Sequence, residues 1–579
     1  MSKRKKRKKR RKKGRRGPAT PVGMRESLRK PSIAWQEVMF IGILILASLP
    51  RFLGLLSGLP EHPEFRERYI VETALNLEHR TGFPEEYFWP GTFWYLVLAL
   101  WFRLGEAVHG GALAVGDATT WARFLSVILS LATVWLTFHL GRRAYGVEVG
   151  LLGALFLAGM MLHATQESRF ALVDTPLTLL AVWVLMRCFP ERTEWNWRYT
   201  AGLGALLGLA IATKFVAVVL ILPVLCALSM AVAKQRARER KGKKPPSEGE
   251  FAHPPLVKPL LQQGGVGLLF AVLAFTVACP FWIYPAGDKF VSGVQYALTH
   301  YQKGHYGLFA SDVFTPLRRV TYLWPLLAWG MGWPLALLSI VWLGWALWRR
   351  ERGDVLLLWG VIPLLALLAG YKAKFPHHLL MLYPVLAVGA ARVLLAVRAW
   401  ARPRGAKWIW RVAVAGVFAY SFAYTLAFAN VYRASPTIVQ AQRWISVSVP
   451  IGKTVSVGPE LPLRWLIPEV PGTVVEADFE ADSEFILVPA PAARLYRAYT
   501  SKPQAYRLED WHPLEAYDPK PQATFYQRLF AADSGYEVVQ KFSNPPRLWR
   551  WTIDLSEAPP PFGMLTNPEI TVYRRAKVE

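Results

Sequence analysis

Long apolar runs recur through most of this chain, and they restrict its fold more than any other feature. The first covers Ile33–Leu56, and similar runs follow as far as residue 430. Stretches of roughly 18 or more apolar residues are typical of transmembrane helices. Inside a bilayer the backbone polar groups of such a run must be satisfied within the chain, which a helix achieves. The sequence therefore predicts a polytopic α-helical membrane protein, in agreement with a composition of 53% hydrophobic and 19% charged residues.

Basic clusters between the apolar runs predict which loops face the cytoplasm, because Lys and Arg are retained on that side. The clusters are Arg142-Arg143, 234–244, 349–352 and 398–407. They share the side of the N-terminus only if the short, aromatic-rich segment 92–107 lies at the interface without crossing. The same placement of the basic clusters requires segment 200–232 to form two spans that meet near Lys214. We therefore expect about eleven transmembrane helices, together with interfacial helices.

The chain divides into three expected regions. Residues 1–32 form a basic tail, which supplies much of the net charge of +28 and should be disordered because like charges repel. Residues 33–430 form the transmembrane domain, in which 233–257 is expected to be a disordered cytoplasmic linker. Residues 431–579 carry strand-like runs at 485–488, 536–539 and 570–573, which predict a small extracytoplasmic α/β or α+β domain.

The basic tail itself has three interpretations. It can hold the N-terminus in the cytoplasm, which we favour, attract anionic lipid headgroups, or bind RNA nonspecifically. No specific nucleic-acid partner is expected. Membrane lipids are expected partners of the chain as a whole.

Charged residues gather on the predicted outer side, although ionisable groups at a membrane boundary are unfavourable unless they are partnered or functional. The loop after the first span reads Glu61-His62-Pro63-Glu64-Phe65-Arg66-Glu67. The same side is expected to carry Glu167, Arg169, Asp174, Lys214, His300, His305, Lys372, Lys374, His377 and His378. A carboxylate there can act as a general base, and the cations can stabilise charge on a departing phosphate. The pattern predicts a site that binds an anionic lipid phosphate and abstracts a proton.

Five motifs occur in the order found in the polyprenyl-phosphate-sugar-dependent glycosyltransferases of the C type. They are His62-Pro63-Glu64 followed by Tyr69, the segment 167–177, Gly208-Leu209-Ala210 through Thr213-Lys214, Cys279-Pro280-Phe281 with 300–305 after it, and 374–379 leading to Tyr383-Pro384. The chain resembles this family, which includes protein O-mannosyltransferases and the lipid A aminoarabinose transferase, over roughly residues 33 to 430.

The resemblance implies an enzyme that moves a sugar from a polyprenyl-phosphate donor to a lipid, glycan or protein acceptor. It implies that the reaction takes place at the outer face of the plasma membrane, with the N-terminus in the cytoplasm. Glu64 and Asp174 are the expected catalytic residues. Substrate contacts are expected from His62, Glu67, Arg169, Lys214, His305, Lys374 and His378.

The first motif departs from the family pattern. Its usual form is His-Pro-Asp-Glu, whereas this chain has Glu64-Phe65, so the expected base is longer by about 1.5 Å and its acidic neighbour is missing. Hard divalent cations prefer several oxygen ligands. No metal or other cofactor is therefore assigned.

Each of these residues also has a simpler interpretation. Asp174 before Thr175-Pro176 is typical of a helix start. Lys214 can be an interfacial lysine with its head in water, and His377 and His378 can lie at headgroup level. The Trp and Tyr clusters are typical of interfacial belts.

A second function class uses the same cationic groove without catalysis. A lipid-linked-saccharide binder or transporter would need a similar site, but transporters commonly show internal repeats. The second half of the chain does not repeat the pattern of 33–230. The sequence therefore favours the enzyme.

Overall fold

The computed structural model describes residues 35–60, 64–78, 92–190, 195–241, 257–282, 286–303, 316–371, 374–401, 407–457, 474–476, 483–490, 519–531, 533–564 and 567–576. The first helices are α1 (Trp35–Phe52), α2 (Phe65–Glu78), α3 (Phe93–His109), α4 (Val115–Tyr145), α5 (Val147–Ala158), the π-helix η2 (Leu162–Gln166), α6 (Glu167–Arg169), α7 (Asp174–Arg187), α8 (Trp197–Thr213), the 3-10 helix η3 (Phe215–Leu220), α9 (Ile221–Lys241) and α10 (Val257–Ala278). They continue with α11 (Ala286–Lys303), α12 (Pro316–Thr321), α13 (Leu323–Met331), α14 (Trp333–Arg349), α15 (Arg352–Gly370), the 3-10 helix η5 (Pro376–Leu382), α16 (Tyr383–Ala401) and α17 (Lys407–Val431).

Seven helices of the described residues are long and apolar enough to cross a membrane, so the chain is a multi-pass helical membrane protein. They are Trp35–Phe52, Val115–Tyr145, Phe215–Lys234, Pro259–Ala278, Arg352–Gly370, Pro376–Ala401 and Trp408–Val431. The pair Val147–Ala158 and Leu162–Arg169, bent by 65°, would add an eighth as one broken span. Helices α7 and α8 lie at predicted spans but have only 14 and 17 residues, fewer than the roughly 20 that usually cross a bilayer. Eleven crossings therefore stay a prediction.

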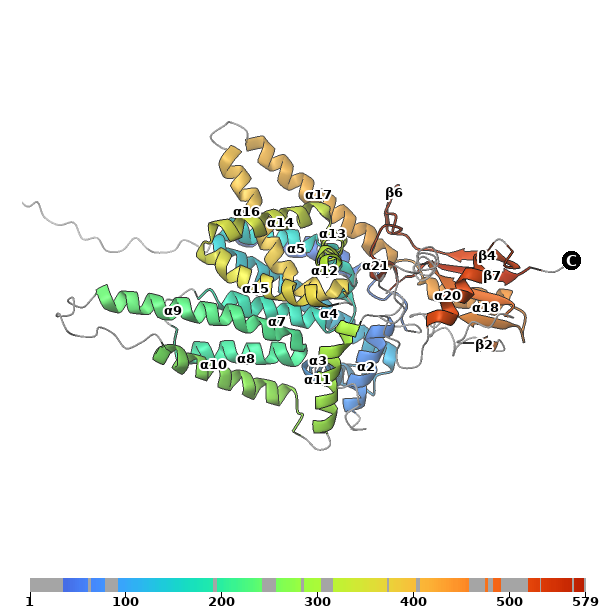
Figure 1. Cartoon of the computed structure of the whole chain (residues 1–579), viewed down its shortest axis with the longest axis horizontal. Helices are drawn as coiled ribbons and strands as arrows, with labels where there is room; N and C mark the ends of the chain where they lie inside the picture. Colours follow the sequence, from blue (N-terminus) through green and yellow to red (C-terminus); the bar gives the residue numbers. More distant parts are fainter. Residues whose placement is uncertain are drawn as a thin grey trace, which may run out of the picture.

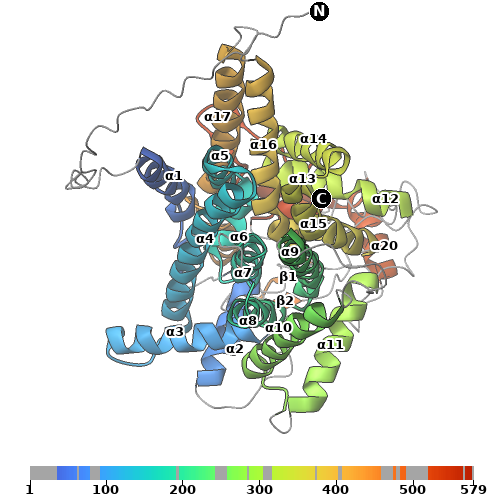
Figure 2. The same ribbon diagram turned by 90° about the vertical axis from the view of Figure 1, so that its left-hand side faces the viewer.

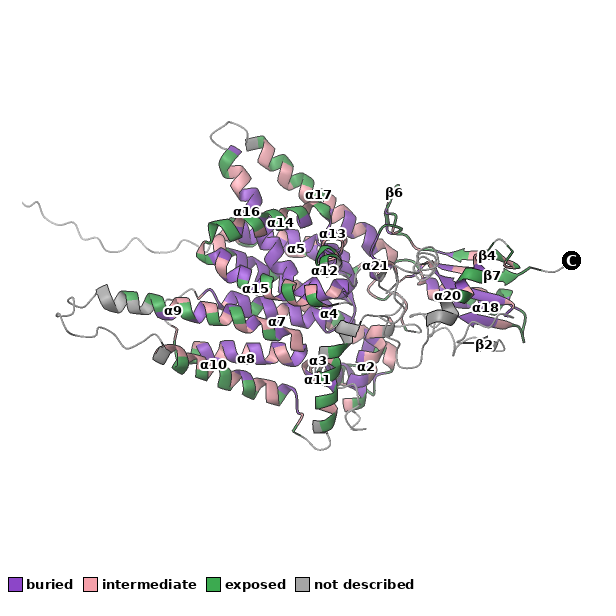
Figure 3. Cartoon of the chain, in the orientation of Figure 1, coloured by how far each residue is buried: buried purple, intermediate pink, exposed green. Residues whose placement is uncertain are grey.

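The spans form one bundle whose centre is buried and whose outer helices expose apolar side chains (Figure 3). Helices α7 to α10 run side by side in Figure 1, and α7 and α8 are seen end-on in Figure 2. A Cβ at Gly204 or Gly208 of α8 would overlap the backbone carbonyl of Gly267 or Ala271 on α10. Small residues of this kind let membrane helices approach closely. The sequence therefore sets the α8–α10 contact through its glycines.

Helix α3 lies across one end of this bundle. Figure 2 shows its length, whereas α7 and α8 point toward the viewer. One face buries Trp94, Leu98 and Phe102, while Leu100 and Val108 on the other face are exposed. The structure therefore agrees with the prediction that 92–107 does not cross. Helices α2 and α11 lie across the same end (Figure 1), which we call the α2 end.

The long apolar segment 200–232 is interrupted at Lys214, as predicted. Helix α8 ends at Thr213, and Lys214 has the extended conformation φ −159°, ψ 125° before η3 begins. The predicted linker at 233–257 is wrong in its first part, because α9 continues to Lys241. Ala, Arg, Lys and Glu are strong helix formers, so the basic composition does not end the helix. Residues 242–256 lie outside the described part.

Side-chain contacts bring several predicted cytoplasmic loops to the opposite end of the bundle. Arg398 of α16 donates to Glu148 of α5 over 2.7 Å. The Tyr145 hydroxyl at the end of α4 donates to Asp354 in the first turn of α15. The α4–α5 turn, the start of α15 and the end of α16 therefore share one end, as the basic clusters predicted.

Strands occur after α17, and the described residues there also form three further helices. The elements are α18 (Thr437–Ser448), β1 (Thr454–Val457), β2 (Val474–Glu476), β3 (Phe485–Pro489), α20 (Pro519–Leu529), β4 (Tyr536–Phe542), β5 (Arg547–Leu548), β6 (Trp551–Thr552), α21 (Pro560–Met564) and β7 (Ile570–Arg575). The sheet order is β2-β1-β3-β7-β4, with β1 parallel to β2 and β3, and β7 antiparallel to β3 and β4. Ala441 and Ile445 of α18 pack on Val455 and Leu487. Strands occupy all three predicted runs, and the sheet lies beyond the α2 end (Figure 1).

Candidate active site

Two buried arginines fix the backbone that follows α1. Arg123 of α4 donates from Nη1 to the carbonyl oxygens of Leu55, at 2.7 Å, and Ser57, at 2.9 Å. Arg169 of α6 donates from Nη1 to the carbonyl oxygen of Leu53 over 2.6 Å. Both side chains are fully buried. Hydrogen bonds from charged donors are stronger than neutral ones, so the backbone at residues 53–57 is held firmly.

Glu67 of α2 completes this support. Nε of Arg123 donates to both carboxylate oxygens of Glu67 at 3.0 Å, and both side chains are fully buried. The backbone N–H groups of Glu64, at 3.0 Å, and Ala171, at 3.3 Å, donate to the same carboxylate. These contacts favour a supporting role for Glu67, and by the same reasoning for Arg169, over the substrate contact expected from sequence.

Glu64 lies immediately before α2 and caps it. Its Oε2 accepts from the backbone N–H groups of Arg66, at 2.9 Å, and Glu67, at 3.2 Å, which have no partner inside the helix. Nε of Arg66 donates to Oε1 over 2.7 Å. Burial raises the pKa of Glu64 above its ordinary value, against the lowering effect of Arg66. The carboxyl is therefore well placed and holds a proton more readily than an exposed glutamate does.

Arg66 joins Glu64 to a second carboxylate. Its Nη1 lies 3.8 Å from Oε1 of Glu167 in α6. The neighbouring carboxylates raise the pKa of Arg66 above its ordinary value, although burial lowers it. Oε2 of Glu167 is buried and has no hydrogen-bond partner among the described residues. Glu167 therefore supplies the acidic neighbour that Phe65 does not provide.

Asp174 and Lys214 form a nearly buried ion pair beside these groups. Nζ of Lys214 donates to Oδ1 of Asp174 over 2.9 Å, and the two side chains are 10% and 8% exposed. Asp174 is the first residue of α7, whose N-cap is Val173 and lacks a side-chain hydrogen bond. Asp174 therefore stands at a helix start, as the sequence predicted, but its carboxylate pairs with Lys214. The water-facing interpretation of Lys214 is wrong. Glu167 interacts electrostatically with both residues.

We call Glu64, Arg66, Glu167, Asp174 and Lys214 the charged cluster. Its members come from the start of α2, from α6, from α7 and from the break after α8. Among the described residues, no group of three or more His, Cys, Asp or Glu side chains could hold a metal ion. The cluster is thus an arrangement of carboxylates and cations, with one carboxylate oxygen free to accept a hydrogen bond.

The late motif carries three further basic residues, of which His377 interacts with the cluster. Lys374 is buried and its Nζ donates to the carbonyl oxygen of Tyr371. Burial lowers the pKa of Lys374 to about 8, and the charge of Arg319 adds to this effect. His377 and His378 have ring centroids 4.7 Å apart, and His377 interacts electrostatically with Lys214 and Arg66 of the cluster.

Some predicted site residues lie outside the described part. They are Glu61, His62, His305 and Lys372. His300 lies in α11, but its side chain is outside the description. Their contribution remains a prediction from the sequence.

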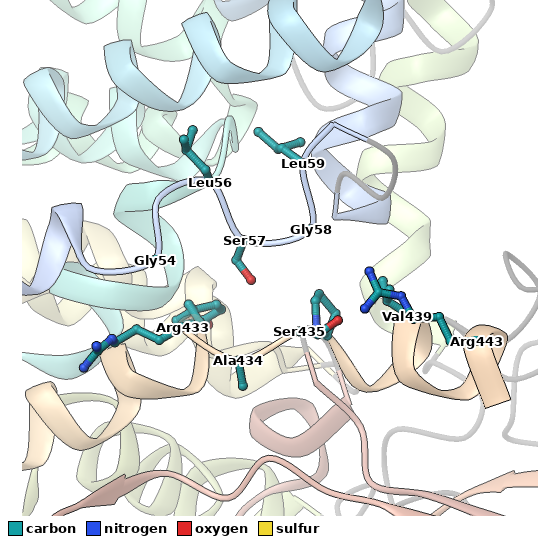
Figure 4. Close-up of a pocket in the computed structure, with 12 residues that line it drawn as sticks. Gly54, Leu56, Ser57, Gly58, Leu59, Arg433, Ala434, Ser435, Val439 and Arg443 are labelled. Carbon is teal, nitrogen blue, oxygen red and sulfur yellow. The ribbon is translucent and has the colours of Figure 1, made fainter.

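A cavity of about 430 Å³ opens on the other side of the first loop (Figure 4). It lies between residues 54–59 and the segment 432–443, which leads into α18. Arg433 and Arg443 line it, and its described lining contains no carboxylate. Tyr432 also lines it and stacks under the Arg169 guanidinium, whose Cζ lies 3.9 Å from the ring centroid. Tyr432 therefore lies between the lining of the cavity and the buried Arg169.

Arg123 is the main residue that the sequence analysis missed. It lies within a helix of 31 residues that is otherwise apolar enough to span the membrane. A buried arginine in such a helix is unfavourable without a partner, so its position in the sequence could have indicated a paired or functional residue. Its partner Glu67, however, is 56 residues away, and the pairing could not be read from spacing.

Replacement of Gly54 by Ala is expected to disturb this loop strongly. Gly54 has φ +70°, and a Cβ there would overlap the backbone carbonyl of Tyr432. Gly110→Ala is the matched control, since its φ is +81° but nothing lies within 4 Å of the added Cβ. The control carries only the left-handed strain, about 1–2 kcal/mol. Thermal unfolding in detergent should therefore show a clearly larger loss for Gly54→Ala, and equal losses would contradict the contact with Tyr432.

Comparison with known proteins adds independent information. Residues 106–245 match the family model described as dolichyl-phosphate-mannose-protein mannosyltransferase. No curated protein matches the chain in sequence. The matched range contains Glu167, Asp174 and Lys214 of the charged cluster.

Several solved structures are similar to this chain. One is ArnT from Cupriavidus metallidurans bound to undecaprenyl phosphate, with 14% identity, a TM-score of 0.49, and coverage of 93% of this chain and 98% of that one. Another is the oligosaccharyltransferase AglB from Archaeoglobus fulgidus in complex with an inhibitory peptide and a dolichol-phosphate, with 10% identity, a TM-score of 0.49, and coverage of 90% and 75%. The S. cerevisiae Pmt1-Pmt2 complex bound to the sugar donor has 17% identity, a TM-score of 0.32, and coverage of 47% and 35%.

Proposed function

We propose that this chain is a membrane glycosyltransferase of the C type, which transfers a sugar from a polyprenyl-phosphate donor to an acceptor hydroxyl. The match of residues 106–245 to a mannosyltransferase family model supports the proposal. The observation that supports the proposal best is the charged cluster at the α2 end of the bundle. Burying charged groups is unfavourable unless they are paired or used. Here most are paired, and the buried Oε2 of Glu167 is left to accept a hydrogen bond from a substrate.

In the proposed reaction Glu64 removes the proton of the acceptor hydroxyl. The acceptor oxygen forms a bond to the anomeric carbon of the sugar, and the bond between that carbon and the phosphate oxygen breaks. The polyprenyl phosphate leaves with the electron pair. The raised pKa of Glu64 suits this role, because a base works best when its pKa lies near the operating pH.

Lys214, Lys374 and His378 are proposed to bind the donor phosphate, assisted by His62 and His305. Asp174 would hold the Lys214 ammonium in place through their hydrogen bond. Cations aimed at the charge that develops on a leaving phosphate usually supply the largest electrostatic contribution. Because Lys374 loses its charge as the pH rises through about 8, donor binding should weaken above that pH.

The donor sugar is proposed to be a hexose or pentose, and the acceptor a lipid, glycan or protein. The cavity between the first loop and α18 supports an approach of the acceptor from that side, since Tyr432 links it to Arg169. Residues 431–579 would then recognise the acceptor or cover the site. Within the described residues, no observation favours the transport alternative.

The proposal is tested by adding polyprenyl-phosphate sugars to the purified full chain in nanodiscs. A cognate donor at about 100 times its Kd should stabilise the fold by roughly 2.7 kcal/mol, seen as a higher unfolding temperature. Incubation with an acceptor extract should then release polyprenyl phosphate. Stabilisation without release, for every donor tested, would contradict the enzyme and support a binding protein.

We also propose that the α2 end faces away from the cytoplasm and that the chain crosses the plasma membrane eleven times. The basic clusters at the opposite end support this orientation, because Lys and Arg are retained on the cytoplasmic side. Helices α7, α8 and α14, shorter than the seven clear spans, occupy three of the predicted crossings. The N-terminus would then be cytoplasmic and residues 431–579 extracytoplasmic.

Single cysteines at Gly110 and Gly146 test this orientation in intact cells. Both glycines have positive φ, so the substitutions carry backbone strain, but nothing lies within 4 Å of an added Cβ and no clash results. A membrane-impermeant thiol reagent is expected to label Gly110→Cys, after α3, and not Gly146→Cys, between α4 and α5. Labelling of Gly146→Cys before lysis would reverse the proposed sidedness, and labelling of both only after lysis would contradict it equally.

A further inference from the structure

The β5–β6 hairpin exposes a large apolar side chain, which is unfavourable if only water surrounds it. Trp549 at its turn is 92% exposed, and its φ of +52° is in the left-handed region. A residue with a Cβ in that region costs about 1–2 kcal/mol. The flanking Arg547 and Arg550 are exposed as well. The turn therefore exposes one indole and two guanidinium groups, and the backbone of Trp549 has an unfavourable conformation.

The base of the hairpin packs on a membrane-spanning helix. The Trp551 ring lies 6.0 Å from the ring of Tyr420 and 6.5 Å from that of Tyr424, both on α17. Asn430 of α17 donates to the carbonyl oxygen of Arg547 over 3.1 Å. Ile553 and Phe562, which follow the hairpin, belong to the core of the bundle. The hairpin is therefore a fixed part of the α2 end, beside the point where α17 ends (Figure 1).

The contact of Trp551 with α17 lies close to the end of the span, at the expected depth of the lipid headgroups. Tyr424 lies within the span Trp408–Val431, about two helical turns or roughly 10 Å before its end. Tyr and Trp are enriched where membrane helices meet water, because each ring has an apolar body and a polar group. A hairpin that packs on Tyr424 and extends outward from the bundle meets the headgroup region.

We propose that the β5–β6 hairpin is a membrane anchor, which places Trp549 in the headgroup region of the leaflet at the α2 end. Arg547 and Arg550 then contact lipid phosphates, since basic residues near anionic headgroups are each worth about 1 kcal/mol. The anchor would hold residues 431–579 over the charged cluster. It does not depend on sugar transfer and can be tested without a donor or an acceptor.

The test uses the full chain in nanodiscs, with a thiol-reactive fluorophore on Trp549→Cys. Cys226 is replaced by Ala beforehand, and Cys188 and Cys279 are buried. Lipids with a nitroxide at the headgroup are expected to quench the fluorophore at 549 several-fold more than one on Ile451→Cys. Ile451, in the turn after α18, is 86% exposed and is the matched control. Arg550→Cys serves as a second reporter of the same turn.

Quenching by aqueous iodide shows whether water or protein, instead of lipid, surrounds the fluorophore at residue 549. An anchored fluorophore at 549 is quenched by lipid nitroxide and weakly by iodide. Quenching by iodide alone, as at 451, would mean that the turn is in water and would overturn the proposal. Protection from both quenchers would mean that protein covers the turn, either a partner or a second copy, and would overturn it equally.

The arginine contacts have a test of their own. Replacing part of the phosphatidylcholine by phosphatidylglycerol should increase nitroxide quenching at 549. Arg547→Gln combined with Arg550→Gln should remove this increase, while Arg528→Gln, on the exposed surface of α20, should leave it. Retention of the increase in the double variant would contradict the proposed contacts with lipid phosphates.

Discussion

Replacement of Glu64 by Gln is expected to lower turnover by roughly 100- to 10,000-fold, the usual contribution of a positioned general base. The amide keeps the size of the side chain but cannot take the acceptor proton. Donor binding should persist, because the proposed phosphate contacts come from other residues. The measurement is release of polyprenyl phosphate, compared with donor-dependent thermal stabilisation of the same variant.

Glu72→Gln is the matched control for this experiment. Glu72 lies on α2 as well, and its exposed side chain pairs with Arg68, so turnover should not change. Glu167→Gln distinguishes the two neighbouring carboxylates. If Glu64→Gln keeps near-full turnover and Glu167→Gln loses most of it, the catalytic base is Glu167. If only Glu61→Gln or Glu67→Gln loses turnover, the first motif has been aligned to the wrong glutamate. Unchanged turnover in the Gln variants of Glu61, Glu64, Glu67 and Glu167 would contradict an active site at this loop.

Glu64→Asp tests whether the site has adapted to the longer side chain. Asp is the residue expected here from the resemblance of the first motif, but it retracts the carboxylate by about 1.5 Å. The contacts of Glu64 with two backbone N–H groups and with Arg66 depend on its present length. We therefore expect Asp to be slower. A faster Asp variant would mean that the chain carries a degraded form of the motif.

The pH dependence of kcat/KM follows from the same carboxyl. Only the deprotonated form of Glu64 can act as a base, and burial raises its pKa. Activity should therefore be lost, as the pH falls, at a higher pH than an exposed glutamate with a pKa of about 4.3 would give. On the alkaline side, loss of the Lys374 charge near pH 8 should weaken donor binding.

Replacement of Lys214 by Ala is expected to have two separable effects. Loss of a charge-assisted contact with the donor phosphate, about 1.5–3 kcal/mol, corresponds to roughly 10- to 100-fold in affinity. The buried Asp174 also loses its partner, and breaking a buried pair costs about 3–5 kcal/mol of stability. Donor titration and thermal unfolding measure the two effects independently.

A double variant separates structure from function at this pair. Lys214→Met with Asp174→Leu removes both charges, so stability should largely return while donor affinity stays low. Lys453→Ala is the control, because its pair with Glu484 is exposed and such pairs contribute about 0–1 kcal/mol. Unchanged donor affinity in stable Lys214 variants would restrict Lys214 to a structural role.

The sequence alone determined the features that depend on local composition. The apolar runs predicted the helices, and the basic clusters predicted which loops share an end. The short aromatic segment 92–107 lies across the end of the bundle, as expected of a segment that does not cross. The interruption at Lys214 was predicted for the same reason. Each of these is decided by the length, hydropathy or charge of one segment in a membrane, so neighbours in space were not needed.

Only the tertiary structure decided which charges are partners. Arg123 meets Glu67, Arg66 meets both Glu64 and Glu167, and Lys214 meets Asp174 instead of water. These groups come from different helices, and spacing along the chain does not reveal which helices are neighbours. Packing of the bundle does, because a buried charge is tolerated only where another helix supplies its counterion or a carbonyl oxygen.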